Sequence, residues 1–206
     1  MKNYLAVLST TALISFAPYA LAASSTDLSV TGTITPSACA VSLSGGGSID
    51  IGKVSAKDLK PTSSTQVGVN PLQLTMTCDS ATLVALKSID NKEGTATEDV
   101  YFGLGLTNAG EKLGFSMLAI NQTTADAQVA QAIGSTDGGA TWDRARVVNK
   151  TLLLSVGTAA DPGTPIQVKD VLMDMEVHTF IARADSLTLT DEVTIDGSAT
   201  IEVKYL

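Results

Sequence analysis

The stretch "TPSACAVSLSGGG", residues 35–47, holds the first of the two cysteines in the chain. Cys39, Val41 and Leu43 alternate with smaller residues, which predicts a short strand with these three side chains on one face. The triple glycine that follows lies between two predicted strands, so it supplies no helix N-terminus for binding an anion. Three roles are open for Cys39 at this point: metal binding, catalysis and a disulfide.

The second cysteine, Cys78, ends the strand-like run 72–78, and it lies 39 positions after Cys39. Neither cysteine belongs to a C-x-x-C pair, which disfavours zinc and thioredoxin-type chemistry. Two cysteines of an exported protein usually pair with each other, because the compartment is oxidising. We predict a Cys39–Cys78 disulfide that joins two neighbouring strands.

The N-terminus has the pattern of a secretory signal peptide. Lys2 precedes an apolar core that contains Pro18, and Ala20-Leu21-Ala22 forms an A-x-A cleavage pattern. We predict that residues 1–22 are removed, and that no later segment is apolar enough to span a membrane. The mature chain is then exported, first to the periplasm.

The charge of the mature chain excludes some partners. The signal peptide carries one of the 13 basic residues and none of the 21 acidic ones, so the mature chain has a net charge of −9. This charge disfavours nucleic acid and anionic membrane surfaces as partners. The 184 remaining residues suit one domain.

Period-two runs bounded by Gly, Asn, Asp and Pro recur along the chain, which is typical of an antiparallel β-sandwich. We predict an all-β fold with two antiparallel sheets, in which residues 23–31 are a short extension and residues 32–206 form the domain. Only 123–133 has a helical pattern. The predicted strands are 28–34, 38–43, 48–54, 72–78, 82–89, 100–106, 112–120, 144–149, 151–157, 171–182, 187–195 and 198–206.

The sequence offers little for catalysis. His178 is the single histidine and lies in a strand-like run, without the second ligand or nucleophile that a site requires. The acidic pairs Asp174/Glu176 and Asp191/Glu192 are interpreted as solvent-facing residues of strands and turns. We predict no catalytic residue, no metal site and no cofactor, so the protein is not expected to be an enzyme.

One motif favours a different interpretation. "STDGGATW", residues 135–142, matches the Asp-box, S-x-D-x-G-x-T-W, of sialidase-like propellers, and this makes a glycoside hydrolase a remote alternative. A propeller repeats its blades four to eight times, whereas this chain has one copy of the box. We therefore interpret it as a hairpin turn with Trp142 packed beside it, and expect substitution of Asp137 or Trp142 to affect stability.

Three parts of the chain together resemble the chaperone–usher pilins. These parts are the signal peptide, the cysteine frame "VTGTITPSACAVSLSGGG" and "LQLTMTCDS", and the terminal "ATIEVKYL" with its penultimate Tyr205. The segments "SIDIGKVSAKDL", "CDSATLVALKSIDNKEG" and "FGLGLTNAGEKLGFSML" are also similar to a fimbrial-like family of exported proteins with no assigned role.

The resemblance implies an immunoglobulin-like sandwich that lacks its last strand and is completed by a donor strand from another subunit. Leu28 and Val30 would then be the inserting residues of the donor strand. Ile201, Val203 and Tyr205 would border the acceptor groove and meet a periplasmic chaperone. The implied partners are this chaperone, an outer-membrane usher and other fimbrial subunits, and the implied location is the fimbrium or cell surface, serving adhesion or surface structure.

Two alternatives remain open at this stage. Only nine residues separate Ala22 from Gly32, so the subunit either accepts a strand while donating poorly, or is a self-contained monomeric binding module of the periplasm or surface. The chain is longer than a major pilin mainly over 107–142, and this insertion-like region is either a binding face or decoration.

Overall fold

The computed structural model describes residues 28–32 and 38–206. The predicted signal peptide 1–22 lies outside the described residues, as do positions 23–27 and 33–37. The described residues belong to two units, 28–32 and 38–206. Residues 28–32 contain no regular secondary structure, so the described part of the predicted strand 28–34 is not a strand. The side chains of Leu28 and Val30 are 90% and 88% exposed.

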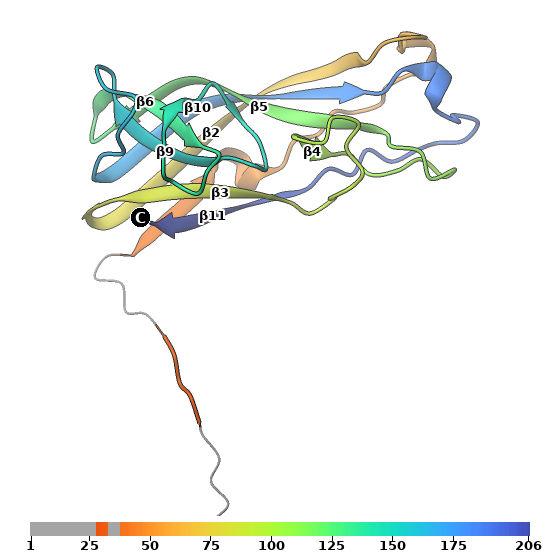
Figure 1. The fold of residues 1–206 in the computed structure, drawn as a ribbon. Helices are drawn as coiled ribbons and strands as arrows, with labels where there is room; N and C mark the ends of the chain where they lie inside the picture. The colour runs from red at the N-terminus through yellow and green to blue at the C-terminus, as the bar shows by residue number, and fades with distance from the viewer. Residues whose placement is uncertain (1–27, 33–37) are drawn as a thin grey trace, which may run out of the picture. The chain divides into compact units, whose positions relative to one another are not determined.

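Residues 38–206 form an antiparallel all-β domain, which confirms the predicted fold class (Figure 1). Three short 3-10 turns interrupt it, η1 (Ser44–Gly47), η2 (Ala56–Asp58) and η3 (Ala184–Ser186). The strands of the described chain are β1 (Cys39–Leu43), β2 (Thr65–Thr82), β3 (Val84–Asp90), β4 (Phe102–Gly103), β5 (Gly114–Ala125), β6 (Gln128–Ser135), β7 (Asp143–Arg144), β8 (Val147–Val148), β9 (Leu153–Thr158), β10 (Val168–Ile181) and β11 (Ala199–Tyr205).

The two expected layers are joined into one hydrogen-bonded path, with the order β1-β2-β10-β5-β6-β9-β3-β11. The path turns over between β5 and β6, so that β2, β10 and β5 lie in one layer while β3 and β11 lie in the other (Figure 1). β1 and β11 are the two ends of this path. Each of them pairs with only one strand of the described chain, β2 and β3 respectively.

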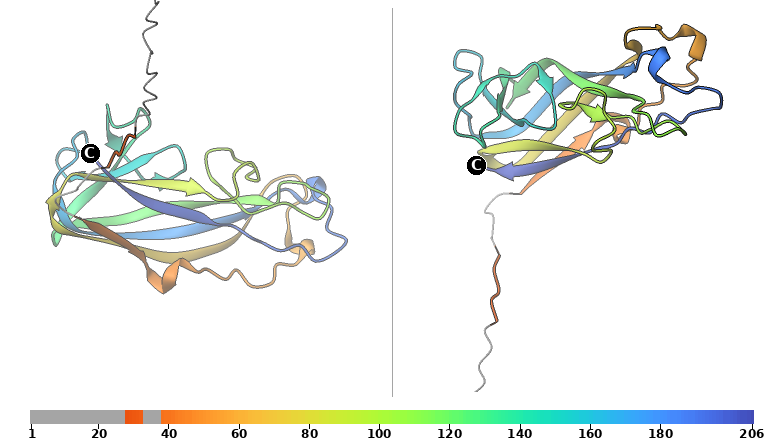
Figure 2. Two further views of the ribbon diagram at one scale, coloured as in Figure 1. Left: turned by 90° about the horizontal axis from the view of Figure 1, so that it is seen from below. Right: turned by 45° about the vertical axis from the view of Figure 1, so that its right-hand side comes forward.

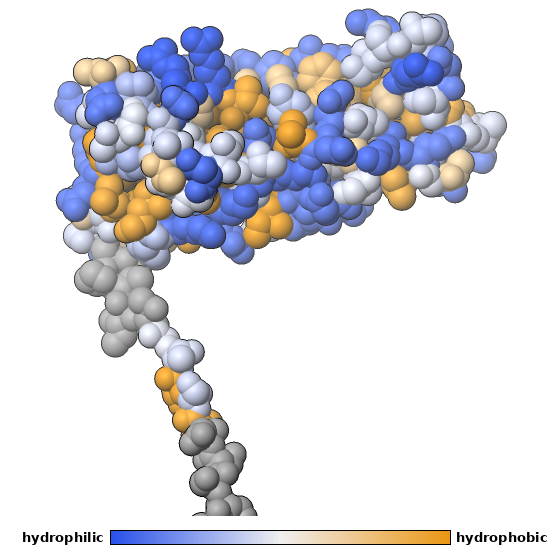
Figure 3. All heavy atoms as spheres, in the orientation of Figure 1, coloured by the Kyte–Doolittle hydropathy of each residue, from blue (hydrophilic) through white to orange (hydrophobic). Residues whose placement is uncertain are grey.

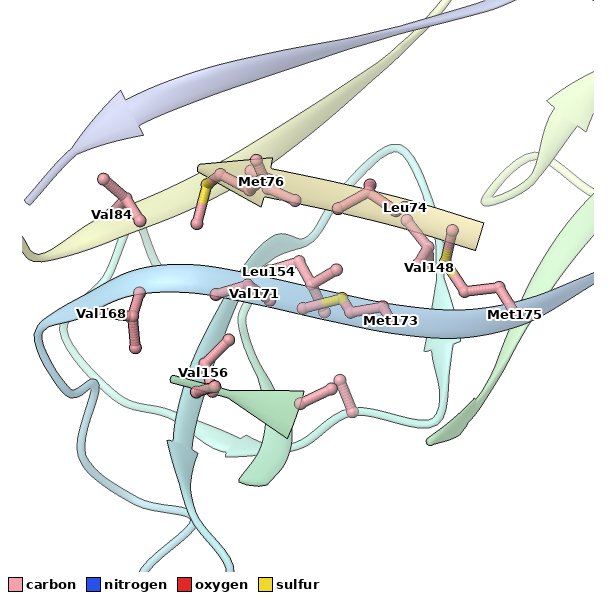
Figure 4. Close-up of a cluster of buried hydrophobic side chains, with 14 of the residues drawn as sticks. Leu74, Met76, Val84, Val148, Leu154, Val156, Val168, Val171, Met173 and Met175 are labelled. Atoms are coloured by element: carbon pink, nitrogen blue, oxygen red, sulfur yellow. The ribbon is translucent and has the colours of Figure 1, made fainter. Parts of the chain in front are cut away.

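The main core lies between the layers and follows the alternation of the strands. Every second residue of β10 from Val171 to Ile181 is buried, and so is every second residue of β2 from Leu72 to Cys78. Figure 4 shows side chains from both layers pointing toward one another. The labelled ones are Leu74, Met76, Val84, Val148, Leu154, Val156, Val168, Val171, Met173 and Met175. On the face drawn in Figure 3, apolar residues form separate small patches within a polar surface.

The predicted disulfide is confirmed. Cys39 and Cys78 are direct cross-strand partners in the β1–β2 ladder, and their sulfurs are bonded. Cys78 is 1% exposed, so the bond attaches the five-residue strand β1 to the core.

The helical prediction for 123–133 is wrong, because this segment forms the hairpin between β5 and β6. Asp126 and Ala127 make the two-residue turn and both have positive φ, 48° and 62°. Such a turn matches the twist of paired strands but is unusual for alanine. The Ala- and Gln-rich sequence favours a helix only in isolation, and here strand pairing prevails.

The hairpin also shows that the insertion-like region 107–142 contributes two main strands of the sheet, β5 and β6.

Two predicted strands, 48–54 and 187–195, are not strands in the structure. Both have the expected alternation, since Ile49, Ile51, Val193 and Ile195 are half-buried while residues between them are exposed. Neither segment has a neighbouring strand of the described chain to pair with. In these two segments the alternating pattern correctly predicts which side chains are half-buried, although no hydrogen-bonded ladder forms.

The Asp-box segment 135–142 forms a closed turn. Asp137 accepts hydrogen bonds from the Ser135 hydroxyl at 2.6 Å, and from the backbone N–H and hydroxyl of Thr141. The Ser135 bond, followed by those from Thr141, lowers the pKa of Asp137 below its ordinary value. The Trp142 indole N–H donates to the Gly139 carbonyl, and the ring packs beside Ala85. These contacts agree with a structural turn.

Removing the disulfide tests how strongly it holds β1. In C39A/C78A we expect the free energy of unfolding to fall by about 4 kcal/mol, the chain-entropy value for a loop of this length. Urea denaturation of the oxidised protein and of the variant measures the difference. Adding a reductant should destabilise the natural protein and leave the variant unchanged. A loss below about 1 kcal/mol would contradict this role.

Candidate strand-acceptor groove

The outer edge of β11 is unpaired within the described chain. The carbonyl of Ser198 accepts from Asn91, and the N–H of Leu206 donates to Leu83, so even-numbered residues direct their backbone groups toward the β3 side. Antiparallel ladders alternate strictly. The N–H and C=O groups of Ile201 and Val203 therefore point away from β3, and their half-buried side chains face inward.

The free edge of β1 follows the same rule. The Ala38 carbonyl accepts from the N–H of Asp79 in β2, so the backbone groups of Cys39, Val41 and Leu43 point away from β2. The Cys39 N–H has found another partner, since it donates to the hydroxyl of Tyr205 at 3.0 Å. This bond ties the start of β1 to the end of β11, and the two edges face each other beyond it.

Pro71 explains why β1 ends at Leu43. Odd-numbered residues of β2 direct their N–H groups toward β1, and Pro71 has no N–H to offer. The last of these donors is the Gln73 N–H, which bonds to the Ser44 hydroxyl at 3.0 Å. Gly45 and Gly46 then turn the chain with φ of 61° and 67°, values that favour glycine. The following segment, 48–54, leaves the β2 edge.

A groove of about 770 Å³ lies between the two edges. One wall comes from the end of β1 and residues 47–54, and the other from residues 189–199 and Ile201. Figure 2 (left) shows the domain from this side, with β11 and the orange segment after β1 on either side of the strands behind them. The base is mostly apolar and is formed by Leu72, Phe102, Leu104, Leu113, Leu118, Val177 and Ile181 together with Ser88, Ser116 and Thr179.

Side-chain hydrogen bonds hold the wall at 187–198 in place of a strand ladder. The Glu111 carboxylate accepts from the backbone N–H of Thr188 at 2.6 Å and from its hydroxyl at 2.8 Å. These bonds, the backbone one first, lower the pKa of Glu111. Asn91 donates to the hydroxyls of Ser198 and Thr200 at the other end of the wall. The wall is thereby fixed from one side, and its other side faces the groove.

The rim of the groove is charged. Asp50 and Lys53 lie on the β1 side, and Asp191 and Glu192 lie on the opposite side. Lys53 reaches across to Glu192, with 3.8 Å between the charged atoms, and both side chains are exposed. An exposed pair of this kind contributes little to stability, so it presents only a small obstacle to a segment entering the groove.

The structure separates the predicted acceptor residues. Ile201 lines the groove, Val203 lies outside the lining and packs against the main core, and the Tyr205 hydroxyl accepts from the Cys39 N–H. His178 lies in β10, with Nδ1 2.9 Å from the amide nitrogen of Gln66. The sequence interpretation missed Asp191 and Glu192 as groove residues, although their position inside an alternating apolar run, 187–195, was a signal.

Residues 28–32 and 38–206 contain no group of three or more His, Cys, Asp or Glu side chains arranged to hold a metal ion. In the same part of the chain, no helix has the length and apolarity needed to cross a membrane.

The fold and the groove define a disulfide-linked antiparallel β-domain with two facing open edges. The chain belongs to the family described as "Protein of unknown function (DUF1120)", whose profile matches residues 28–141. It is similar to Protein GltF of Escherichia coli (strain K12), with 25% identity over 245 residues that cover 98% of this chain and 96% of the relative. It is also similar to the uncharacterized protein YhcF of the same strain, with 26% identity over 227 residues that cover 93% and 94%.

The role of Glu111 in the groove wall is testable. E111A should speed amide hydrogen exchange at Thr188, because that N–H loses its acceptor. E98A is the matched control, since Glu98 is exposed and its carboxylate has no bonding partner in the described part of the chain. The protection depends on an ionised Glu111, whose folded pKa is lowered. It should thus be complete above the ordinary glutamate pKa of about 4.3 and decline as pH falls through the folded value. Equal exchange in E111A and E98A would contradict the role.

Proposed function

We propose that the chain is a structural subunit of fimbrial type, which accepts a β-strand from a partner into the groove between β1 and β11. The proposal gives the protein no catalytic role. Its partners are a periplasmic pilus chaperone, an outer-membrane usher and other fimbrial subunits, and its place is the periplasm in transit and then the fimbrium or cell surface.

The observation that carries this proposal is the pair of facing open edges above an apolar base. Unpaired strand edges are templates for another strand, and proteins usually cover, shorten or charge them. Here the edge groups of Leu43 and Ile201 flank a groove whose base is apolar. An entering strand would satisfy both edges and bury its alternate side chains, as in β-strand addition.

The charged rim supports the proposal, because it protects the open edges from pairing with unrelated strands. Asp50, Asp191 and Glu192 surround its mouth, while the leucine, valine and isoleucine side chains lie at the base. Charges at an open edge disfavour indiscriminate pairing with other strands. A partner must therefore present apolar side chains on one face and tolerate acidic groups on the rim.

The N-terminal residues 28–32 support a second part of the proposal. Leu28 and Val30 are separated by one residue and are almost fully exposed, so both are available to another molecule. Two apolar side chains on one face match the alternation that a neighbouring subunit's groove requires. The chain would then donate this short strand as well as accept one, with export directed by the signal sequence.

Hydrogen exchange tests strand acceptance at single residues. The mature chain, residues 23–206, is compared alone and in complex with a periplasmic pilus chaperone. We expect the amides of Leu43 and Ile201 to become protected by at least about tenfold in the complex, because each gains a hydrogen bond. Thr200 and Glu202 are the internal controls, since their amides already point toward β3.

Two results would contradict the proposal. The first is a stable monomer that forms no chaperone complex, which would support a self-contained binding module. The second is a complex in which the amides of Leu43 and Ile201 remain unprotected. Deleting residues 23–31 tests donation separately, because it should abolish complexes between subunits while leaving the chaperone complex intact.

A further inference from the structure

A second hollow lies on the domain at the point where β5 and β6 separate. The two strands pair only from Thr123 to Ala125 with Gln128 to Ala130, beside their turn. Further along, residues 143–148 enter between them: β7 pairs with β6, β8 pairs with β5, and the Arg146 carbonyl accepts from the Ile120 N–H. The hollow at this fork has a volume of about 310 Å³.

Two arginines line the hollow from the inserted segment. Arg144 and Arg146 lie two residues apart and are exposed, while Ala145 between them is buried, so both side chains project from one face. Neither guanidinium has an ion-pair or hydrogen-bond partner within residues 28–32 and 38–206. Asp174 lies opposite Gln122 in the β10–β5 ladder, but its carboxylate accepts from the Gln73 amide and not from either arginine. In a mature chain with a net charge of −9, this is an unneutralised local positive charge.

The rest of the lining is rich in hydrogen-bonding groups. Asn121 and Gln122 lie beside a register shift in the β10–β5 ladder, and Gln131 faces them from β6. Thr123 is 4% exposed, and its hydroxyl is buried without a hydrogen-bond partner among the described residues. A buried hydroxyl without a hydrogen-bond partner lowers the stability of the fold. Rotation about χ1 of Thr123 would exchange the positions of this hydroxyl and the methyl group. Val129, 72% exposed, adds an apolar surface.

We infer that this hollow binds an acidic saccharide, that is, a sugar residue that carries a carboxylate. Guanidinium groups bind carboxylates through paired, charge-assisted hydrogen bonds. Side-chain amides and a hydroxyl suit sugar hydroxyls, and an apolar side chain such as Val129 suits the face of the ring. The volume lies at the lower end for small-molecule sites, which fits one sugar residue. None of these residues lines the strand-acceptor groove, so this inference is independent of the proposed function.

Calorimetric titration of the purified mature chain with D-glucuronate tests the inference. We expect saturable binding, with D-glucose at least about tenfold weaker because it lacks the carboxylate. R144Q/R146Q should lose at least about tenfold in affinity for the same reason. K57Q/K60Q removes the same charge from exposed lysines outside the hollow and should bind normally. T123V should weaken binding by about threefold without lowering the unfolding midpoint, since its hydroxyl has no partner to lose.

Several results would overturn the inference. They are the absence of saturable glucuronate binding, equal affinity for inorganic phosphate and glucuronate, and equal effects of the arginine and lysine variants. If R144Q/R146Q fails to fold, R146Q and T123V are titrated instead, and unchanged affinity in both would also overturn it.

Discussion

Backbone hydrogen bonding at the edges of β1 and β11 is the constraint on which the rest of this domain depends. A strand in the interior of a sheet satisfies both of its edges, whereas each of these strands satisfies one among the described residues. The unsatisfied groups face each other across an apolar base. An additional strand at this position would meet an unpaired edge on each side.

Several local features keep the two edges apart and in place. Pro71 ends the β1–β2 ladder. The segment 48–54, which follows β1 in the chain, can therefore form one wall of the groove. Glu111 and Asn91 hold the other wall by side-chain bonds. The disulfide and the Tyr205 hydroxyl fix the end where the edges meet. Together these features hold the two walls of the groove in place.

Much of the fold could be predicted because it rests on local patterns. The period-two runs predicted the all-β class, and the spacing of Cys39 and Cys78 together with the expected export of the chain predicted their bond. The errors have physical causes: 48–54 and 187–195 have the pattern of strands but lack a partner, and the Asp126–Ala127 turn places two residues at positive φ without a glycine. The arginine hollow could not be predicted, since Arg144 meets Asn121 only through the forking of β5 and β6.

The most direct measurement of the open edges is the thermal unfolding midpoint of a chain that carries its own additional strand. A flexible linker after Leu206 followed by an alternating apolar–polar strand would run antiparallel to β11 and enter the groove. The account predicts a marked rise in the midpoint for this fusion. It predicts no rise for a strand of the same composition in which the alternation is scrambled, because polar side chains would then enter the groove in every register. Equal midpoints for the two fusions and for the unmodified mature chain would contradict the open-edge account.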